Sequence, residues 1–472
     1  MSFVSPEFAL VCLLFFPVYW ALADRWRWQR GFLILSAYAL YASWVPFFAA
    51  VLLAYSTVVW VLGRWMQVAR PRHRPLALGL WLAGCFLVTL KYYEFVRESF
   101  QALLEVMGFQ SLLPVLDVVA PVGVSFFTFQ AITYLVSVGR QSLTPRSWAD
   151  VLLFLSFWPT LFAGPILRAE HFFAQVDATQ VGRPIQGWRA LYLIALGLVQ
   201  KAVLASWLAA QVVDPVYKFP EQHASASLLA AMLGYSLQIF LDFAGYTSIV
   251  TGVALLMGYT LPINFRQPYL ARNLSDFWTR WHVSLSSFIR DYIYIPLGGN
   301  RRGWARTQWN VLAGMLISGL WHGANWTFVV WGLMHGLGVV ALNLAGRLGM
   351  KPWPRFAAQA VTFLFVTLAW VFFRADSLAQ AGQMLQGLFS LPQAAELAGS
   401  AGPGRTAPWW PLLLLTGTVL GLSAWAQALE AWCTGLLQRM GRWAACVCLS
   451  AVLCAVLYWG PEGVPGFIYY RF

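Results

Sequence analysis

Two stretches of this 472-residue sequence carry polar side chains whose types and spacing suit catalysis. In the first, His322 lies in an otherwise apolar region and is followed by Gly323, Asn325 and Trp326. Because Asn325 and Trp326 follow His322 at i+3 and i+4, they share its face if the helix continues. A desolvated histidine favours its neutral form, which is the form that a general base needs. We therefore expect His322 to be a candidate general base, with a purely structural buried histidine as the alternative.

The second stretch, residues 273–306, is the longest polar segment of the chain. In its centre, residues 276–292, apolar residues recur at helical spacing and charged residues lie mostly opposite, which predicts an amphipathic helix at the cytoplasmic membrane interface. His282 falls near the boundary of the two faces. The glycine-rich loop that follows is flexible enough to approach a phosphate. Arg290, Arg301 and Arg302 are therefore candidates for binding phosphate, and ordinary cytoplasmic arginines are the alternative.

Other ionisable residues within the apolar regions give weaker signals. His335 lies 13 residues beyond His322, which is about 220° around one straight helix. The two histidines therefore do not share a face, and we predict no zinc pair and no bound metal. Asp242 and Lys91 are intramembrane charges, each of which suits either a structural pair or a site.

The composition defines the class of protein. Hydrophobic residues make up 60% of the sequence and charged residues 10%, whereas soluble domains average roughly 45–50% and 25%. One soluble core cannot hide so much apolar surface, but a bilayer can. The formal net charge of +13 comes from basic clusters between apolar stretches. That pattern is typical of cytoplasmic loops and argues against a nucleic-acid partner.

These apolar stretches predict an all-α, polytopic membrane protein with about 11–12 transmembrane helices in a single domain, residues 1–472. The basic clusters place the N-terminus outside the cytoplasm. A break at Pro46 and an interrupted segment at 149–167 predict short or re-entrant helices, and residues 390–408 suggest an exposed loop. The predicted spans are 3–23, 31–45, 46–63, 76–93, 118–138, 188–212, 227–258, 307–322, 325–346, 356–373, 409–432 and 443–460.

Several long motifs in this order resemble the membrane-bound O-acyltransferases, and in particular their alginate O-acetyltransferase branch. The resemblance covers most of the chain and rests on residues 121–130, 163–168, 276–282, 290–300, 320–325 and 467–472. It implies a ring of tilted helices around a thinned centre, with funnels from both faces meeting near a catalytic histidine. It assigns that role to His322 and the second signature position to His282.

The chain also departs from the family pattern at two positions. Relatives commonly carry a second acidic residue where Ser248 ends the motif that begins at Asp242, and an acidic residue where Trp60 stands. Neither departure touches His322 or His282. Both weaken the case that the substrate is alginate itself.

The resulting hypothesis is an O-acyltransferase of the bacterial inner membrane that moves an acetyl group from cytoplasmic acetyl-CoA towards a periplasmic polysaccharide or partner protein. We expect acetyl-CoA as the substrate and no bound cofactor, with Trp321 and Asn325 orienting His322 or contacting the oxyanion. The alternatives are acyl transfer to peptidoglycan or cellulose, D-alanyl transfer to teichoic acid, and a transporter or export pore without covalent chemistry.

Overall fold

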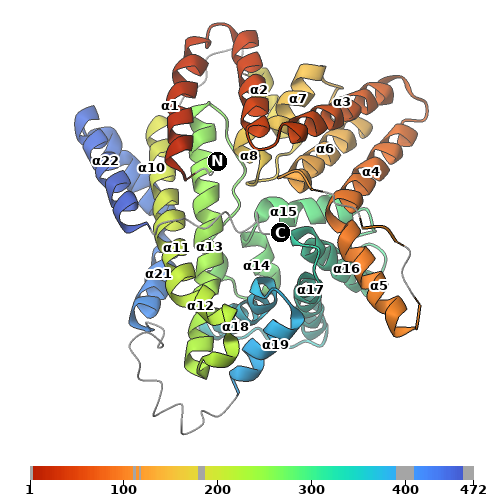
Figure 1. The fold of residues 1–472 in the computed structure, drawn as a ribbon, viewed down its shortest axis with the longest axis vertical. Coiled ribbons are helices and arrows are strands. Elements are labelled where there is room, and N and C mark those ends of the chain that lie inside the picture. Colours follow the sequence, from red (N-terminus) through yellow and green to blue (C-terminus); the bar gives the residue numbers. More distant parts are fainter. Residues whose placement is uncertain (1–3, 110–112, 116–118, 179–185, 390–408, 461–472) are drawn as a thin grey trace. The chain divides into compact units, whose positions relative to one another are not determined.

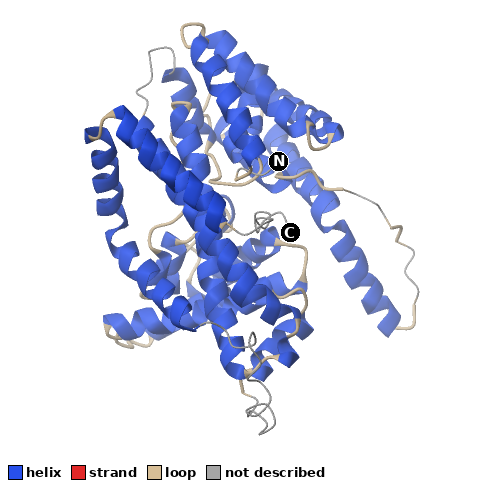
Figure 2. Cartoon of the chain, turned by 60° about the vertical axis from the view of Figure 1, so that its left-hand side comes forward, coloured by secondary structure: helices blue, strands red, loops and turns tan. Residues whose placement is uncertain are grey.

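The computed structural model describes residues 4–109, 113–115, 119–178, 186–389 and 409–460. Helices joined by turns and loops account for all of these residues, without a strand among them (Figures 1 and 2). The prediction of an all-α fold is confirmed. The described chain divides into two compact units, one from residues 1–186 and 253–262 and the other from residues 187–252 and 263–472. Whether the whole chain acts as one domain stays a prediction.

The first unit contains nine α-helices and one π-helical turn among its described residues. The break predicted at Pro46 is present, because α2 ends at Ala42 and α3 begins at Pro46. These elements are α1 (Pro6–Ala21), α2 (Trp26–Ala42), α3 (Pro46–Val68), α4 (His73–Leu87), η1 (Val88–Tyr92), α5 (Tyr93–Val106), α6 (Val124–Gly139), α7 (Trp148–Ser156), α8 (Trp158–Leu161) and α9 (Ala169–Ala178).

The interrupted segment at 149–167 forms the buried core of this unit. Helix α7 stops at Ser156, α8 makes a single turn, and all residues from 150 to 167 are buried. Gly123, at φ +78°, lies directly against the carbonyl of Leu161 and leaves no space for a side chain. Irregular backbone at membrane depth persists only where protein covers it, and this segment meets that condition.

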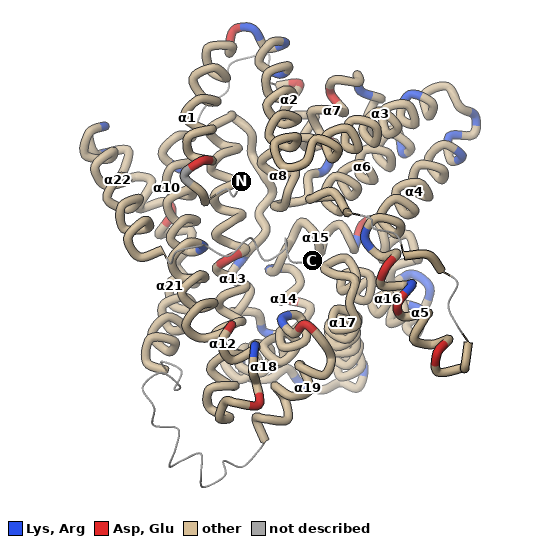
Figure 3. Tube along the Cα trace, viewed as in Figure 1, with Lys and Arg blue, Asp and Glu red and all other residues tan. Residues whose placement is uncertain are grey.

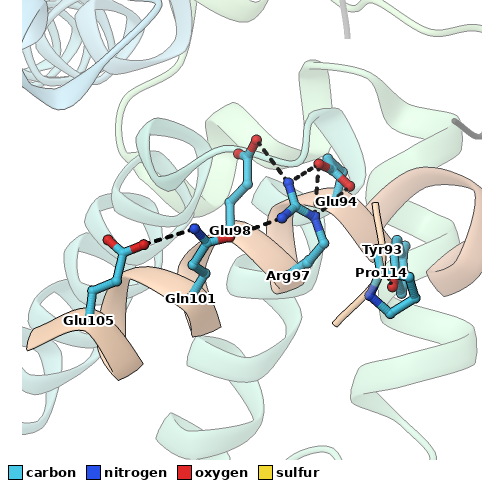
Figure 4. Close-up of polar contacts among 7 residues, drawn as sticks. All are labelled: Tyr93, Glu94, Arg97, Glu98, Gln101, Glu105 and Pro114. Carbon is cyan, nitrogen blue, oxygen red and sulfur yellow. Dashed lines mark hydrogen bonds and ion pairs between the residues drawn. The ribbon is translucent and has the colours of Figure 1, made fainter. Parts of the chain in front are cut away.

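Helices α4, η1 and α5 run on without a break, so the connection predicted at 94–117 is helical as far as Val106. A ladder of polar side chains supports the added turns (Figure 4). Arg97 pairs with Glu94 and donates to Gln101 at 3.0 Å, and Gln101 donates to Glu105 at 2.8 Å. Pairs at i+3 and i+4 stabilise a helix where apolar contacts run out.

The second unit carries the predicted site. Its elements are α10 (Gly187–Leu198), η2 (Val199–Ala205), α11 (Ser206–Leu208), η3 (Ala209–Val213), α12 (Asp214–Lys218), η4 (Pro220–Gln222), α13 (Ser225–Leu256), η5 (Pro268–Leu270), α14 (Leu274–Arg280), α15 (Val283–Ile289), η6 (Arg290–Tyr294), α16 (Trp304–His322), α17 (Trp326–Arg347), α18 (Arg355–Arg374), α19 (Leu378–Gly387), α21 (Trp409–Arg439) and α22 (Arg442–Trp459). The last four residues of α13 belong to the first unit.

Burial separates the central helix of this unit from the peripheral ones. Of the 18 most apolar consecutive residues in α13, 83% are buried, whereas the corresponding fraction is 11% in α21 and in α22. The latter two expose large apolar side chains such as Leu413, Trp425 and Val447. A surface of this kind is stable against lipid rather than water.

Eight helices among the described residues are long and apolar enough to cross a bilayer, and two shorter apolar helices, Glu7–Ala21 and Val124–Gly139, accompany them. Charged residues are sparse along the helices and gather mainly at their ends (Figure 3). The chain is therefore a multi-pass membrane protein. The figure of about 11–12 crossings stays a prediction.

Candidate active site

Helices α16 and α17 form an antiparallel hairpin whose backbones almost touch. A Cβ atom on Gly332 would lie 2.6 Å from the carbonyl oxygen of Met315, and one on Gly319 would collide with the carbonyl of Phe328. Glycine at both positions lets the helices approach closely, as small residues do in membrane helix pairs. The hairpin fixes His322, the last residue of α16, against the first turns of α17.

Asn325 begins α17 and does not extend α16. Its side-chain oxygen accepts a hydrogen bond from the backbone N–H of Thr327 at 2.9 Å, and its amide nitrogen donates to the carbonyl of Asp376 at 3.1 Å. The helix does not continue past His322, because Gly323 has an extended backbone that ends α16, so the two residues do not share a helix face and the predicted separation of spans 307–322 and 325–346 is confirmed. Asn325 instead caps α17 and fixes the turn after His322.

His322 is enclosed by aromatic rings. Its exposed fraction is 2%, and the rings of Trp321, Trp331 and Phe373 have their centroids 4.9, 5.1 and 4.9 Å from that of the imidazole. Trp321 is therefore in ring contact with His322, and its predicted role stays a prediction. Such an enclosure keeps water away and strengthens each polar interaction within it.

His282 lies beside this enclosure, and its position corrects the sequence-based prediction. Residues 276–292 do not form one amphipathic helix, because the chain breaks between α14 and α15 and His282 adopts a left-handed conformation with φ 42° and ψ 53°. Its side chain is fully buried rather than at a face boundary. The rings of Phe243, Trp321 and His322 have centroids 4.7, 5.7 and 6.5 Å from that of His282.

Burial lowers the pKa of His282 to about 3. This residue lies outside the eight candidate spans. The cause is desolvation, which penalises the charged imidazolium. His282 is therefore neutral at physiological pH, and the two histidines are adjacent without repelling each other.

His335 is a third histidine of this region, and its position near His322 was not predicted from one straight helix. The antiparallel turn places Trp331 between the two rings, with its centroid 5.1 Å from that of His322 and 4.9 Å from that of His335. A calculation on one straight helix does not include this reversal. The signal in the sequence was the Gly323–Asn325 turn. Among the residues that the structure describes, no three metal-binding side chains gather into a site; the prediction that no metal binds stays a prediction.

Arg301 and Arg302 directly precede α16 and lie at the other end of the hairpin. Helix α16 separates Gly303 from His322 by 19 residues, about 28 Å. Arg290 is paired with Asp291 at 2.8 Å, and this neighbouring carboxylate raises the pKa of the guanidinium. The structure therefore does not bring Arg301 and Arg302 to His322, whereas Arg290 directly follows Ile289, which packs against Gly314 in the middle of α16.

A cavity of about 600 Å³ opens at that basic end. Its lining includes Asn300, Trp304, Gln308 and Arg347, whereas Arg301 and Arg302 lie on the exposed loop beside it. The guanidinium of Arg347 stacks on the Trp304 ring at 4.9 Å. The cavity combines a cation, amides and an aromatic face, which suits a polar, negatively charged group.

The second unit also contains a buried ion pair, of which only one member was predicted from the sequence. Lys201 pairs with Asp242, and both side chains are largely buried. Lys201 lies in the π-helical η2, where α10 and α13 approach so closely that a Cβ on Gly245 would lie 2.8 Å from the carbonyl oxygen of Gly197. Asp242 was predicted as an intramembrane charge and Lys201 was not, although a lysine within an apolar span is itself the signal.

The fold and the site together define a multi-pass membrane enzyme with a water-excluded histidine centre. Residues 122–380, which include all three histidines, match the model of the MBOAT, membrane-bound O-acyltransferase family. The chain belongs to this family and is an acyltransferase.

Relatives of this chain from several bacteria are named for acyl transfer to different acceptors. The chain is 34% identical to the probable alginate O-acetylase AlgI of Pseudomonas syringae pv. tomato over 83% of its own length and 75% of that protein's. It is 35% identical to the peptidoglycan O-acetyltransferase of Helicobacter pylori over 67% and 64% of the two chains. The teichoic acid D-alanyltransferase of Bacillus subtilis is 26% identical, over 54% and 69%.

Proposed function

We propose that this enzyme takes an acetyl group from acetyl-CoA at the cytoplasmic face of the bacterial inner membrane and delivers it to a polysaccharide on the periplasmic side. The observation that carries the proposal is the separation of two unlike sites along α16. A basic cavity lies at one end of this helix, and an aromatic enclosure around His322 lies at the other. A substrate with a phosphate-bearing head and a reactive thioester end suits that arrangement.

In this proposal, His322 acts as a general base. The imidazole takes the proton of the acceptor hydroxyl, and the oxygen attacks the thioester carbonyl carbon. The tetrahedral intermediate expels the CoA thiolate, which receives the proton from the imidazolium. The thioester is already activated, so the step asks little of the protein beyond the base, an oxyanion contact and the exclusion of water.

Neighbouring residues hold this base in place. Trp321 contacts both His322 and His282, and a neutral His282 provides a polar ring beside the base without adding charge. Both ends of the Asn325 amide are engaged by backbone groups. Asn325 therefore acts on His322 through the turn rather than on the oxyanion.

At the cytoplasmic end, the phosphates of CoA meet the basic loop. Arg301 and Arg302 flank the cavity that Arg347 and Trp304 line. Arginine suits phosphate because its planar guanidinium offers paired donors, and the Trp304 face offers a surface for an adenine ring. Arg290 contributes from η6, with Asp291 holding its guanidinium.

The acceptor is an exopolysaccharide of the alginate type, either directly or through a serine of a periplasmic O-acetyltransferase partner. The alginate O-acetylase match spans more of this chain than the peptidoglycan and teichoic acid matches do. An export pore without covalent chemistry finds no counterpart among these relatives, which are named for acyl transfer.

Oriented proteoliposomes test the donor and the direction of transfer. Acetyl-labelled CoA is supplied on one side and oligomannuronate on the other, together with periplasmic extract as a source of the partner. We expect label on the oligosaccharide only when donor faces the basic side. Peptidoglycan fragments and teichoic acid serve as competing acceptors.

Label transfer with donor on the opposite side would overturn the assigned direction. Preferred labelling of a competing acceptor would overturn the alginate-type assignment and keep the enzyme class. Failure to release thiol with every acceptor would overturn acetyl-CoA as the donor.

A further inference from the structure

Within the described residues, three side chains around the α16–α17 hairpin carry buried nitrogen atoms without a hydrogen-bond partner, and one of them, Trp331, contacts His322. His335, Trp278 and Trp331, here called the nitrogen cluster, are in mutual ring contact, with centroid distances of 5.0, 5.7 and 4.9 Å. Within the described part of the chain, neither ring nitrogen of His335 and neither indole nitrogen has a hydrogen-bond partner. His335 and Trp331 are fully buried.

Such a group of unpaired nitrogens calls for a functional reason. An unsatisfied buried donor or acceptor costs about 1–3 kcal/mol, and most buried polar groups have a partner. Phenylalanine would fill an aromatic packing role without this penalty. The cluster therefore retains nitrogen atoms at positions where packing alone favours carbon.

The chemistry of the cluster indicates what it binds. An indole N–H only donates, and a neutral imidazole offers one donor and one acceptor. The cluster thus presents three donors and one acceptor. Its complement is a chain that carries carbonyl oxygens and an occasional amide N–H, which describes the arm of a thioester donor.

The cluster also lies on the route between the two ends of the hairpin. Helix α17 runs from Trp326 beside the His322 turn to Arg347 at the basic cavity. His335 lies about 18 Å along the helix from Arg347 and about 6 Å from Trp331, and Trp331 touches the His322 ring. A donor whose head occupies the basic end meets the cluster before its thioester reaches His322.

We propose that the nitrogen cluster binds the amide- and carbonyl-bearing arm of the thioester donor and thereby positions the thioester at His322. This inference rests on the proposed function. It assigns His335 and Trp278 as substrate-binding residues, which neither the sequence motifs nor the basic cavity identifies.

Two donors of different length test the proposal. Acetyl-CoA carries the full arm, whereas S-ethyl thioacetate has the same thioester without it. His335→Phe keeps the ring and removes both nitrogens. We expect it to raise KM for acetyl-CoA about tenfold, equivalent to about 1.4 kcal/mol, to change kcat less than about twofold, and to leave the rate with S-ethyl thioacetate unchanged.

Three further variants separate binding from packing. His335→Gln restores a donor and an acceptor and is expected to recover most of the wild-type KM. Trp278→Phe acts in the same direction as His335→Phe and replaces it as the test if His335→Phe fails to fold. Phe365 packs beside His335, with ring centroids 5.7 Å apart, and its side chain carries no nitrogen. Phe365→Leu is therefore expected to leave KM for acetyl-CoA unchanged.

If His335→Phe lowers the rate equally with acetyl-CoA and S-ethyl thioacetate, or leaves KM for acetyl-CoA unchanged, the proposal is overturned. The nitrogen cluster is then a packing element. A rise in KM for the oligosaccharide acceptor alone would assign the cluster to the acceptor instead. Absence of thiol release by the wild-type enzyme from either donor would instead overturn the proposed function.

Discussion

The second unit buries polar side chains in two regions that satisfy them in opposite ways. At the α10–α13 crossing, Lys201 and Asp242 neutralise each other as an ion pair. Around the α16–α17 hairpin, the histidines are surrounded by aromatic rings that carry no charge. A pair that satisfies itself has little left to offer a substrate, whereas the ring nitrogens of His335 have no partner among the described residues and are available to one. The comparison separates a structural polar site from a reactive one.

The ion pair provides the largest expected effect on stability. Lys201→Met or Asp242→Leu alone leaves one buried charge without its partner, which we expect to destabilise the protein by about 3–5 kcal/mol. The double variant removes both charges, and we expect it to recover most of that stability and to retain acyl transfer. Thermal unfolding in detergent, together with thiol release, measures both quantities.

A double variant that folds as well as the wild type but has lost activity would contradict the distinction between a structural ion pair and a reactive histidine region. The pair would then take part in the reaction. A double variant as unstable as either single one would contradict the account of the pair as self-satisfying.

The next largest effect on stability is expected from a substitution in the α16–α17 hairpin. Gly332→Ala places a methyl group 2.6 Å from the carbonyl oxygen of Met315, and such overpacking typically costs about 1–3 kcal/mol. The helices must separate, so we expect a lower kcat because His322 shifts from Trp331. Differential scanning fluorimetry and initial rates measure the change.

Gly417→Ala in α21 is the matched control, because a Cβ there meets nothing within 4 Å and the residue lies outside the cavity lining. We expect unchanged activity and a slight gain in stability, as alanine favours helix over glycine. Equal behaviour of the two variants would show that close approach of α16 and α17 does not position the site.

The effect expected to be smallest at neutral pH is a dependence of stability on pH, which develops only as the pH falls. The pKa of His282 is lowered from 6.5 to about 3 by burial, so the folded state resists protonation. Above about pH 6.5 the residue is neutral in both states. As the pH falls from 6.5 towards 3, the unfolded chain binds a proton that the folded chain does not, and stability declines by up to about 1.4 kcal/mol per pH unit.

His282→Asn tests this assignment, because asparagine tolerates the left-handed backbone at this position and does not titrate in that range. Unfolding midpoints between pH 7 and 4.5 are expected to fall less steeply in the variant than in the wild type. Parallel slopes would contradict the assignment of the pH dependence to His282.

The features that could be predicted from the sequence are those that depend on composition and on helix-breaking residues. Apolar length defined the membrane class, Pro46 marked the start of α3, and the glycine and proline residues near 159–165 marked a broken segment. His322 stood out because an ionisable residue within an apolar stretch is costly.

Features that depend on tertiary approach were not predictable in this way. His282 appeared to lie on a helix surface, yet the backbone breaks at that residue and turns it into the interior. The break between His322 and Asn325 was predicted from the two spans, but the capping role of Asn325 follows only from its contacts in the structure. Lys201 meets Asp242, and His335 meets Trp278, only because helices distant in sequence pack together. Periodicity describes one element at a time and contains no such pairings.

The most direct test of the central claim is thiol release from acetyl-CoA by purified His322→Ala, with oligosaccharide acceptor and periplasmic partner at saturation. His73→Ala, at an exposed site of the other unit, serves as the matched control. We predict that the His322 variant loses about 10²–10⁴-fold in kcat while its unfolding midpoint and its insertion into liposomes match those of the control. An unchanged rate in a folded His322→Ala protein would remove this residue from the chemistry and contradict the account.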